Sequence, residues 1–234
     1  LCLDMGNYMI DDLTEVIDSN LTINTEQNSL EVYNYFPTTI YSIKKPEFLG
    51  VVNEVSAEYL RNKDQPLNEI YPVIMSDNYY DDPRIQDFAA FIGHTAWNIL
   101  DSEGYAMDNY NLRFAEMWTQ EHHKHSLMET HVHGFGSQIS GFYFLETPEN
   151  CSRVIIQDPR PGKVQINLPE KNMNQVTRAS SIINFTPEPG LLMFMNSSIP
   201  HSFGRHASDD PIKFVHFNLT AEFVKRIGDS PEVI

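Results

Sequence analysis

Histidines are concentrated in one part of this sequence. Five of the nine histidines fall within residues 122–133, which read HHKHSLMETHVH. Histidine is the commonest metal ligand in proteins, and its neutral ring nitrogens bind ions such as zinc and iron. The question is which of these imidazoles can reach a single ion, and whether another ligand comes from elsewhere in the chain.

The best-placed pair is His131 and His133. The run METHVH reads as a strand, and alternate side chains of a strand point to the same face. The two histidines would stand roughly 7 Å apart along the strand and could both lean onto one ion at about 2.1 Å. Glu129 shares this face and is a further candidate ligand. The EHHKH tract just before is predicted to form an exposed loop or strand edge, with His125 as the exception that lines a pocket.

A third ligand is predicted at His201. In TPEPGLLMFMNSSIPHSF, Pro189 and Gly190 form a tight turn, an apolar strand follows, and the histidine comes just after that strand. Two histidines two residues apart and a remote one on a neighbouring strand would place three ligands on one side of an ion. This facial arrangement leaves other positions open for substrate and dioxygen.

The elements that must position these histidines are strands. After about residue 109, apolar residues alternate in short runs separated by Gly, Pro, Asn or Asp. About eight such runs favour a sandwich or a barrel-like double sheet, of which the jelly roll is the eight-stranded form. The runs are NLRFAEMWTQ, METHVH, SQISGFYFLE, SRVIIQD, KVQINL, SSIINFTPE, GLLMFMN and IKFVHFNLTAE.

Helices are predicted before the strands. Apolar residues recur at helical spacing over residues 46–63 and again over residues 82–104. We expect both helices to flank one sheet, so the fold class is mainly β (α+β), with a jelly-roll core and flanking N-terminal helices. Residues 1–32 are acidic and polar and are predicted to be an extension. The folded domain is predicted to span residues 33–228.

Composition limits the class of protein. The 234 residues, with 41% hydrophobic content, suffice for the core of one domain. A formal net charge of −16 disfavours nucleic acid as a partner, because an acidic surface repels phosphates. No apolar run approaches the roughly 20 residues of a membrane span, and we see no signal peptide. Cys2 and Cys151 are remote from each other, which favours a reducing compartment. We therefore expect a soluble cytoplasmic protein.

Several of these segments together resemble a known family. HVHGFGSQISGFYFLETPENCSRVIIQDPR, followed by PEPGLLMFMNSSIPHSFGRHASDDPIKFVHFN, resembles the 2-oxoglutarate- and Fe(II)-dependent oxygenases of a small bacterial and phage group. Their pattern is H-x-H...SG-x-YY...DPR...PG-x-L-x-x-F...H...FN, and the resemblance covers roughly residues 33 to 220. It implies a double-stranded β-helix fold, which is jelly-roll or cupin-like, with an Fe(II) centre and 2-oxoglutarate as co-substrate. It also implies oxidation of a second substrate by dioxygen, by default hydroxylation, with release of succinate and carbon dioxide.

Carried over to this sequence, the family's metal ligands fall on His131, His133 and His201. Many relatives have H-x-D, and here His133 stands in place of the carboxylate. Three neutral imidazoles leave the +2 charge of the ion uncompensated, which favours an anionic co-substrate. The same ligand set also resembles cupin-like three-histidine dioxygenases that do not use 2-oxoglutarate. That alternative stays open, as does a non-catalytic jelly-roll binding module.

The resemblance also implies a cation for the co-substrate, because a buried carboxylate must be paired. Lys213 is predicted to supply it, with Tyr143 as a hydrogen-bond partner and Arg205 as the other cation beyond the last histidine. Strand alternation leaves this assignment open. Lys213 shares a face with Val215, whereas Ile212 lies on the other face. If the position of the family's arginine corresponds to Ile212, the role of that arginine has moved to another residue in this chain.

Overall fold

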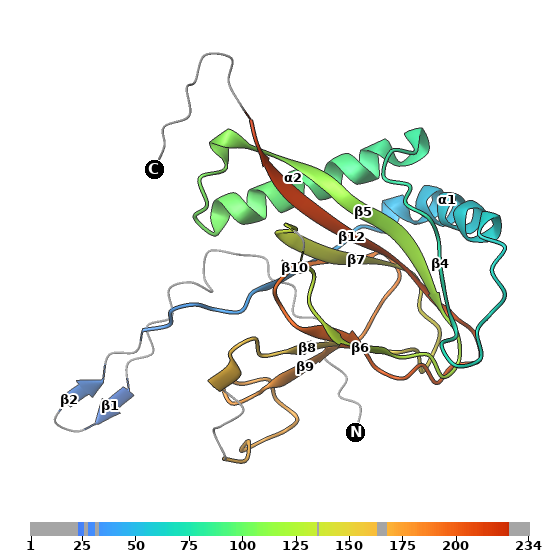
Figure 1. The fold of residues 1–234 in the computed structure, drawn as a ribbon. Coiled ribbons are helices and arrows are strands. Elements are labelled where there is room, and N and C mark those ends of the chain that lie inside the picture. The colour runs from blue at the N-terminus through green and yellow to red at the C-terminus, as the bar shows by residue number, and fades with distance from the viewer. Residues whose placement is uncertain (1–22, 26–27, 31–32, 135, 163–167, 225–234) are drawn as a thin grey trace.

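Two antiparallel sheets face each other in the structure (Figure 1). This computed structural model describes residues 23–25, 28–30, 33–134, 136–162 and 168–224. The larger sheet has the order β3-β10-β7-β12-β5-β4. Its strands are β3 (Ile40–Lys44), β10 (Leu191–Asn196), β7 (Ile139–Glu146), β12 (Ile212–Phe223), β5 (Tyr110–His122) and β4 (Val73–Met75). The smaller sheet consists of β6 (Met128–His131), β11 (His201–Phe203), β8 (Val154–Gln157) and β9 (Ile182–Phe185) in that order.

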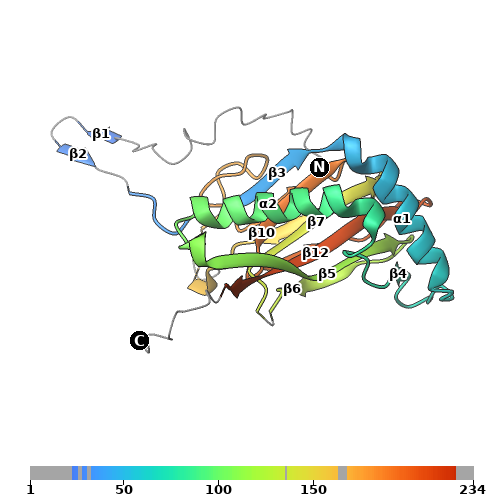
Figure 2. The ribbon, with the colours of Figure 1, turned by 90° about the horizontal axis from the view of Figure 1, so that it is seen from above.

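Two helices cover the outer face of the larger sheet (Figure 2). They are α1 (Leu49–Asn62), which follows a 3-10 turn at Pro46–Phe48, and α2 (Gln86–Ser102), which follows a 3-10 turn at Pro83–Ile85. Asp82 caps the second turn, because its carboxylate accepts a hydrogen bond from the Arg84 backbone N–H at 2.9 Å. The flanking helices predicted at 46–63 and 82–104 are confirmed.

The larger sheet carries a separate core on each face. On the helix side, α1, α2 and the sheet share one apolar cluster, whose fully buried members include Val52, Val55, Phe88, Ile92, Tyr143, Val215 and Phe217. A second cluster fills the space between the two sheets and includes Phe142, Phe144, Ile156, Met193, Phe203, Ile212 and Phe214. Because both faces of β7 are covered, its residues are buried almost without interruption.

Gly141 in the middle of β7 has a packing role. A Cβ atom at this position would clash with the backbone carbonyl oxygen of Met193 and with the ring of Phe217. The absence of a side chain therefore lets the Phe217 ring of β12 lie across β7. This agrees with the sequence pattern, in which SGFYFL interrupts an apolar strand with a small residue.

Seven of the eight predicted runs contain a strand, and the eighth, KVQINL, lies largely outside the described residues. The short strands β4 and β11 were not predicted as separate elements. Two further strands, β1 (Ile23–Thr25) and β2 (Asn28–Leu30), form a hairpin within the predicted extension. The boundary between an extension at 1–32 and a domain at 33–228 stays a prediction.

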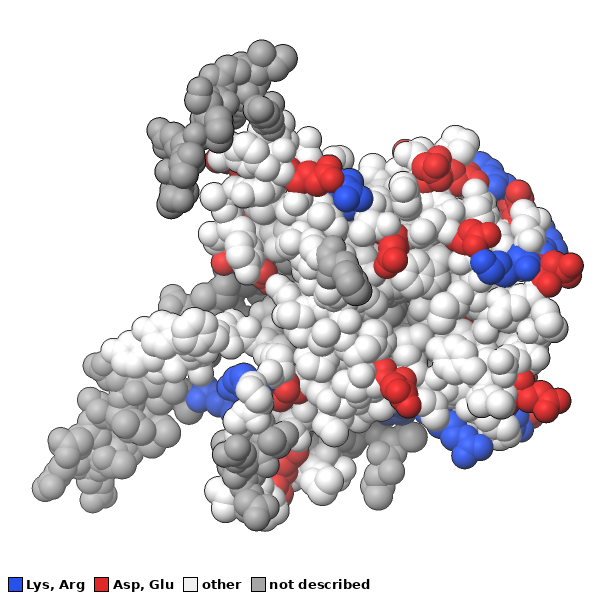
Figure 3. All heavy atoms as spheres, viewed as in Figure 1, with Lys and Arg blue, Asp and Glu red and all other residues white. Residues whose placement is uncertain are grey.

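Charged side chains are scattered over the face of the molecule shown in Figure 3, with acidic and basic groups interspersed. The prediction that nucleic acid is not a partner stays a prediction. In the described part of the chain, no helix combines the length and the apolar character that crossing a bilayer requires.

Candidate metal centre

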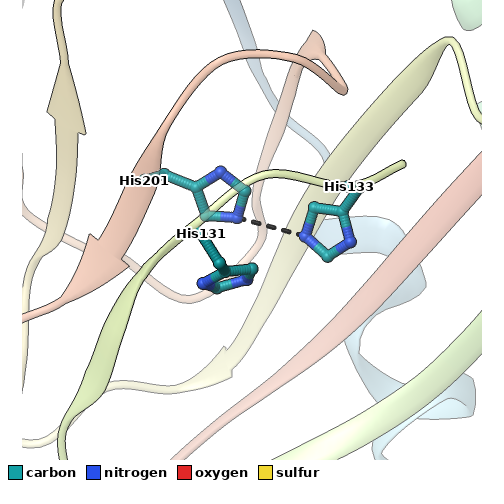
Figure 4. A group of neighbouring side chains, drawn as sticks. All are labelled: His131, His133 and His201. Atoms are coloured by element: carbon teal, nitrogen blue, oxygen red, sulfur yellow. Dashed lines mark hydrogen bonds between the residues drawn. The ribbon is translucent and has the colours of Figure 1, made fainter.

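Three histidine side chains meet where β6 and β11 pair (Figure 4). His131 ends β6, His201 begins β11, and the two residues lie directly opposite each other in the register. His133 follows just beyond β6, where its backbone N–H donates a hydrogen bond to the carbonyl of Ser197 at 2.8 Å. One nitrogen from each ring lies within 4.8 Å of the others. The structure therefore brings together the three residues that the sequence singled out.

The spacing of the ring nitrogens suits one shared ion. The Nε2 atoms of His133 and His201 are 3.2 Å apart. Two nitrogen ligands that bind one ion at right angles, each at about 2.1 Å, would lie about 3 Å apart. The third ring, that of His131, has its centroid 4.5 Å from the centroid of His201 and 5.0 Å from that of His133. The three rings thus surround a common point.

Backbone carbonyls fix two of the three rings. His131 Nδ1 is 2.8 Å from the carbonyl oxygen of Glu129, and His201 Nδ1 is 2.9 Å from that of Ile199. Because a carbonyl oxygen only accepts, each Nδ1 carries the hydrogen and each Nε2 keeps a free lone pair, the form in which histidine binds metal. Glu129 itself is exposed and contributes a carbonyl here, not the carboxylate ligand considered from the sequence.

Asn218 controls the third ring. Its Nδ2 lies 3.2 Å from His133 Nδ1 and 2.9 Å from Glu116 Oε2, while its Oδ1 is buried without a partner. In this arrangement the Nδ2 hydrogens are donated to His133 Nδ1 and to the Glu116 carboxylate, so the His133 ring carries its own hydrogen on Nε2, which points to His201 Nε2. Binding of an ion through Nε2 would require that hydrogen on Nδ1 and the amide turned over, which would break its hydrogen bond to Glu116. The contact with Asn218 therefore couples the protonated nitrogen of His133 to the binding of an ion.

Burial keeps two of the ligand rings, those of His133 and His201, neutral. It lowers the pKa of His133 to about 3, with a smaller contribution from the neighbouring His201 and His131. Burial also lowers the pKa of His201 to about 4, although the backbone of Ile199 acts in the opposite direction. Both rings are unprotonated at pH 7, which is the state that metal binding requires. The donor set and its protonation thus fit a divalent ion such as Fe(II).

The other histidines of the tract lie outside this group. His122 is fully buried in β5, against the rings of Phe203 and Phe214, so the prediction of an exposed tract is wrong for this residue. His125 is exposed and lies 2.9 Å from an Arg205 nitrogen, so the expectation that it lines a pocket is also wrong. The dense tract divides into one core residue and surface residues.

The residues predicted to hold a co-substrate lie away from the three histidines. Lys213 is on the helix side of β12, where its Nζ is 3.3 Å from both Glu121 and Glu146. Tyr143 is also on the helix side, and its hydroxyl donates a hydrogen bond to the Lys45 carbonyl at 2.7 Å. Arg205 is exposed beside His125. This placement argues against the predicted role for all three. Alternation turns the neighbours of Lys213 and Tyr143 toward the metal ligands, and Arg205 lies beyond the end of β11 on the surface.

Sequence reasoning overlooked a polar group beside the metal ligands. The ring of His216 stacks on His133 with centroids 4.6 Å apart, and Trp118 packs on His216 at 4.7 Å. Burial holds the pKa of His216 well below its usual range, as do the nearby histidines, with the Gly141 backbone opposing. The signal was available in β12, where alternation places His216 and Asn218 on the face opposite Lys213.

A comparison with protein families decides the identity of this site. The profile of a family described as "Putative 2OG-Fe(II) oxygenase" matches residues 116–218, a segment that contains all three histidines. Residues 116–218 belong to the 2OG-Fe(II) oxygenase family. The chain is therefore an oxidoreductase of the oxygenase class, and Fe(II) and 2-oxoglutarate are the cofactor and co-substrate that this family uses, as the sequence resemblance implied. No curated protein sequence matches the chain.

Solved structures support the oxygenase fold. The carbocyclase SnoK from nogalamycin biosynthesis has a TM-score of 0.57 at 10% identity, over 82% of this chain and 84% of that one. A prolyl-4-hydroxylase from Pseudomonas putida has a TM-score of 0.54 at 9% identity, over 77% and 92%. HygX from Streptomyces hygroscopicus, solved with nickel and 2-oxoglutarate, has a TM-score of 0.52 at 11% identity, over 78% and 83%. At these identities the likeness establishes the fold, and the predicted jelly roll is confirmed.

Proposed function

We propose that this oxygenase uses His131, His133 and His201 to hold Fe(II) and hydroxylates a substrate not yet identified. The observation that carries the proposal is the convergence of one nitrogen from each ring within 4.8 Å, inside the segment that matches the family. With 2-oxoglutarate and dioxygen, iron bound there supplies an oxidant for a C–H bond, and the by-products are succinate and carbon dioxide.

The chain's own residues hold and shield this centre. The carbonyls of Glu129 and Ile199 fix two ligand rings, and Asn218 fixes the third. The ring of Phe142 meets His201 edge-on with centroids 5.5 Å apart, which limits the access of water from the core side. His201 is fully buried, whereas His131 and His133 are only partly buried, so substrate would approach from their side.

Charge balance supports the co-substrate. Three neutral imidazoles leave the ion's +2 charge unneutralised, and 2-oxoglutarate carries two carboxylates, both ionised at neutral pH. The dianion and the ion would thus form a neutral unit without a protein cation. Buried polar atoms without partners, among them Trp118 Nε1 and Ser140 Oγ, lie on the same face of the sheet and suit a polar ligand.

One observation favours a second candidate function. Among the described residues, every lysine and arginine is at least partly exposed, so none is buried beside the histidines as a carboxylate partner. A three-histidine dioxygenase that binds its substrate directly, without 2-oxoglutarate, would not need such a cation.

We also propose that the protein acts in the cytoplasm and does not bind nucleic acid. The cysteine content of the sequence supports the first statement, and its net negative charge supports the second.

Anaerobic titration with Fe(II) and then 2-oxoglutarate tests the proposal. We expect the weak visible charge-transfer band of the iron chelate, and after oxygen is admitted, succinate formation coupled to oxygen uptake. His131→Ala should abolish the band, whereas His125→Ala, which changes an exposed histidine outside the site, should leave it unchanged. Iron binding without a band on addition of 2-oxoglutarate would favour the three-histidine alternative.

A further inference from the structure

The inter-sheet face of the larger sheet is ordered in rows. Residues opposite each other on neighbouring antiparallel strands point to the same face, and successive rows are about 7 Å apart. One row comprises Trp118, His216 and Phe142, and the next comprises Glu116, Asn218 and Ser140. His133 lies over both rows, since its ring stacks on His216 and its Nδ1 contacts Asn218. The metal ligands therefore sit directly above these two rows.

These two rows contain buried polar atoms that have no partner. They are Trp118 Nε1, Ser140 Oγ, Asn218 Oδ1 and the ring nitrogens of His216, a ring that also lies near the backbone of Gly141. His216 and Ser140 are fully buried, with 1% and 0% of their surface exposed. A buried donor without an acceptor costs free energy, so a group of them beside a metal site indicates a ligand that supplies the acceptors. Trp118, Ser140 and the neutral ring of His216 each offer one hydrogen.

Beyond these rows the space between the sheets is closed by aromatic rings. Phe203 and Phe214 stack with centroids 4.5 Å apart, and Phe142 meets them edge-on at 5.2 and 5.7 Å. Ile212 follows in the next row. The polar side chains of these farther rows are Gln120 and His122, and Gln120 Oε1 is 2.9 Å from His122 Nε2. They lie farther from His133 than the first two rows do, and a carboxylate buried among them would have no cation. The donors nearest to a ligand of the metal are therefore those of the first two rows.

We propose that this chain holds the distal carboxylate of 2-oxoglutarate with three neutral donors, the Trp118 Nε1–H, a ring N–H of His216 and the Ser140 hydroxyl, and not with a lysine or arginine. The inference rests on the proposed function and assigns its co-substrate subsite. The three donors belong to the neighbouring strands β5, β12 and β7 and to two adjacent rows of the same face, next to the ring of His133.

Binding of two acids distinguishes this subsite. The probes are 2-oxoglutarate and 2-oxopentanoate, which has the same five carbons and 2-oxo acid group but no distal carboxylate. Calorimetry of the anaerobic Fe(II)-loaded protein should show that the wild type binds 2-oxoglutarate at least about tenfold more tightly than 2-oxopentanoate, since tenfold is the effect of one good hydrogen bond to a charged group. Trp118→Phe, His216→Phe and Ser140→Ala should each weaken 2-oxoglutarate binding and leave 2-oxopentanoate binding and iron affinity nearly unchanged.

The chain offers matched controls. Lys213→Ala removes the cation predicted from the sequence, and Trp97→Phe changes the only other tryptophan, whose Nε1 donates to the Tyr110 carbonyl on the helix side. Neither should alter the preference for 2-oxoglutarate. The Trp97→Phe protein has Trp118 as its single tryptophan, so its tryptophan emission should change on addition of 2-oxoglutarate. This readout leaves all three proposed donors unchanged.

Two results would overturn the subsite, and they differ. If Lys213→Ala or Arg205→Ala lowers affinity for 2-oxoglutarate tenfold while the three donor variants do not, the carboxylate is held by a cation and only the subsite is wrong. If the wild type binds iron but neither acid, the proposed function fails together with the subsite.

Discussion

The two faces of the larger sheet differ in whether their buried polar groups have hydrogen-bond partners. On the helix side, the hydroxyls of Ser56, Tyr79 and Thr119 form a closed set with oxygen–oxygen distances of 3.1, 2.6 and 2.8 Å. On the inter-sheet side, Ser140 and His216 are equally buried and have no partner. Because an unpaired buried group destabilises a fold, the helix side is built for stability, and the inter-sheet side keeps its donors free for a ligand.

The same contrast separates the two ends of the inter-sheet space. Under the three histidines the facing residues are polar, whereas farther along β12 they are Phe214 and Ile212. Residues that could bind a ligand and residues that stabilise the fold thus lie in neighbouring rows of one sheet. Substitutions that act on only one of these regions can therefore separate the two roles.

The largest effect is expected from His201→Ala. This change removes one of three proposed ligands and should lower Fe(II) affinity by more than the 10–100-fold that loss of an outer partner causes. Anaerobic calorimetry with Fe(II) measures it, and His206→Ala serves as a comparison because His206 is also buried but lies outside the site. Equal iron affinity in the wild type and His201→Ala would refute the metal centre.

Asn218→Leu should lower Fe(II) affinity by about 10–100-fold, because His133 would lose the side chain that hydrogen-bonds to its Nδ1 and orients its ring. Asn218→Asp should retain or increase the affinity, since a carboxylate accepts more strongly the hydrogen that Nδ1 carries when Nε2 binds an ion. The pair of variants separates a positioning role from a simple packing role. Equal loss in both would contradict the orienting role of the amide.

Thr119→Val tests the helix side. The change removes one hydroxyl from the closed set and leaves Ser56 and Tyr79 with fewer partners, so the free energy of unfolding should fall by about 1–3 kcal/mol. Urea denaturation of the metal-free protein measures the change. A loss of iron affinity in this variant would show that the two faces are not independent.

Acidification should show how His122 contributes to the pH dependence of stability. This histidine lies at the apolar end of the inter-sheet space. Burial lowers its pKa to about 3 from an ordinary value of 6.5. The unfolded chain therefore binds a proton that the folded chain excludes, and stability falls as the pH drops from about 6.5 toward 3. His122→Phe should reduce this slope by up to about 1.4 kcal/mol per pH unit. Urea denaturation at pH 7, 6 and 5 compares the two proteins, and parallel pH profiles would exclude this contribution.

The smallest effect is expected from Ser140→Ala. Its hydroxyl has no partner to lose, so the free energy of unfolding of the metal-free protein should change by less than about 0.5 kcal/mol or should rise. A loss comparable to that of Thr119→Val would mean that the Ser140 hydroxyl is paired in solution, and the contrast between the two faces would disappear.

Much of the site could be predicted because its parts are local. The H-x-H pair and a histidine after an apolar strand are patterns of residue type and spacing, and strand pairing then brought His131 opposite His201. Alternation along β12 left the predicted role of Lys213 open, and the structure places this side chain on the helix side. The helices were readable from their periodic apolar residues, since each has one buried side.

The rest depended on long-range packing. Nothing in EHHKH distinguishes His122 from its neighbours, and only the pairing of β5 with β12 turns this ring into the core. The role of Trp118 was missed because a buried aromatic ring is usually core, and its unpaired nitrogen becomes visible only when its surroundings are known. His133 was expected within the strand, but β6 ends at His131.

The pairing of β6 with β11 has a mechanical consequence. β6 is a four-residue strand at the edge of the smaller sheet, and its register with β11 is irregular between His201 and Phe203. An ion bound by His131 and His201 would link β6 to β11 where their pairing is irregular. The metal-free protein would then open locally at this edge more often than the iron-bound protein, and proteases would cleave it there first.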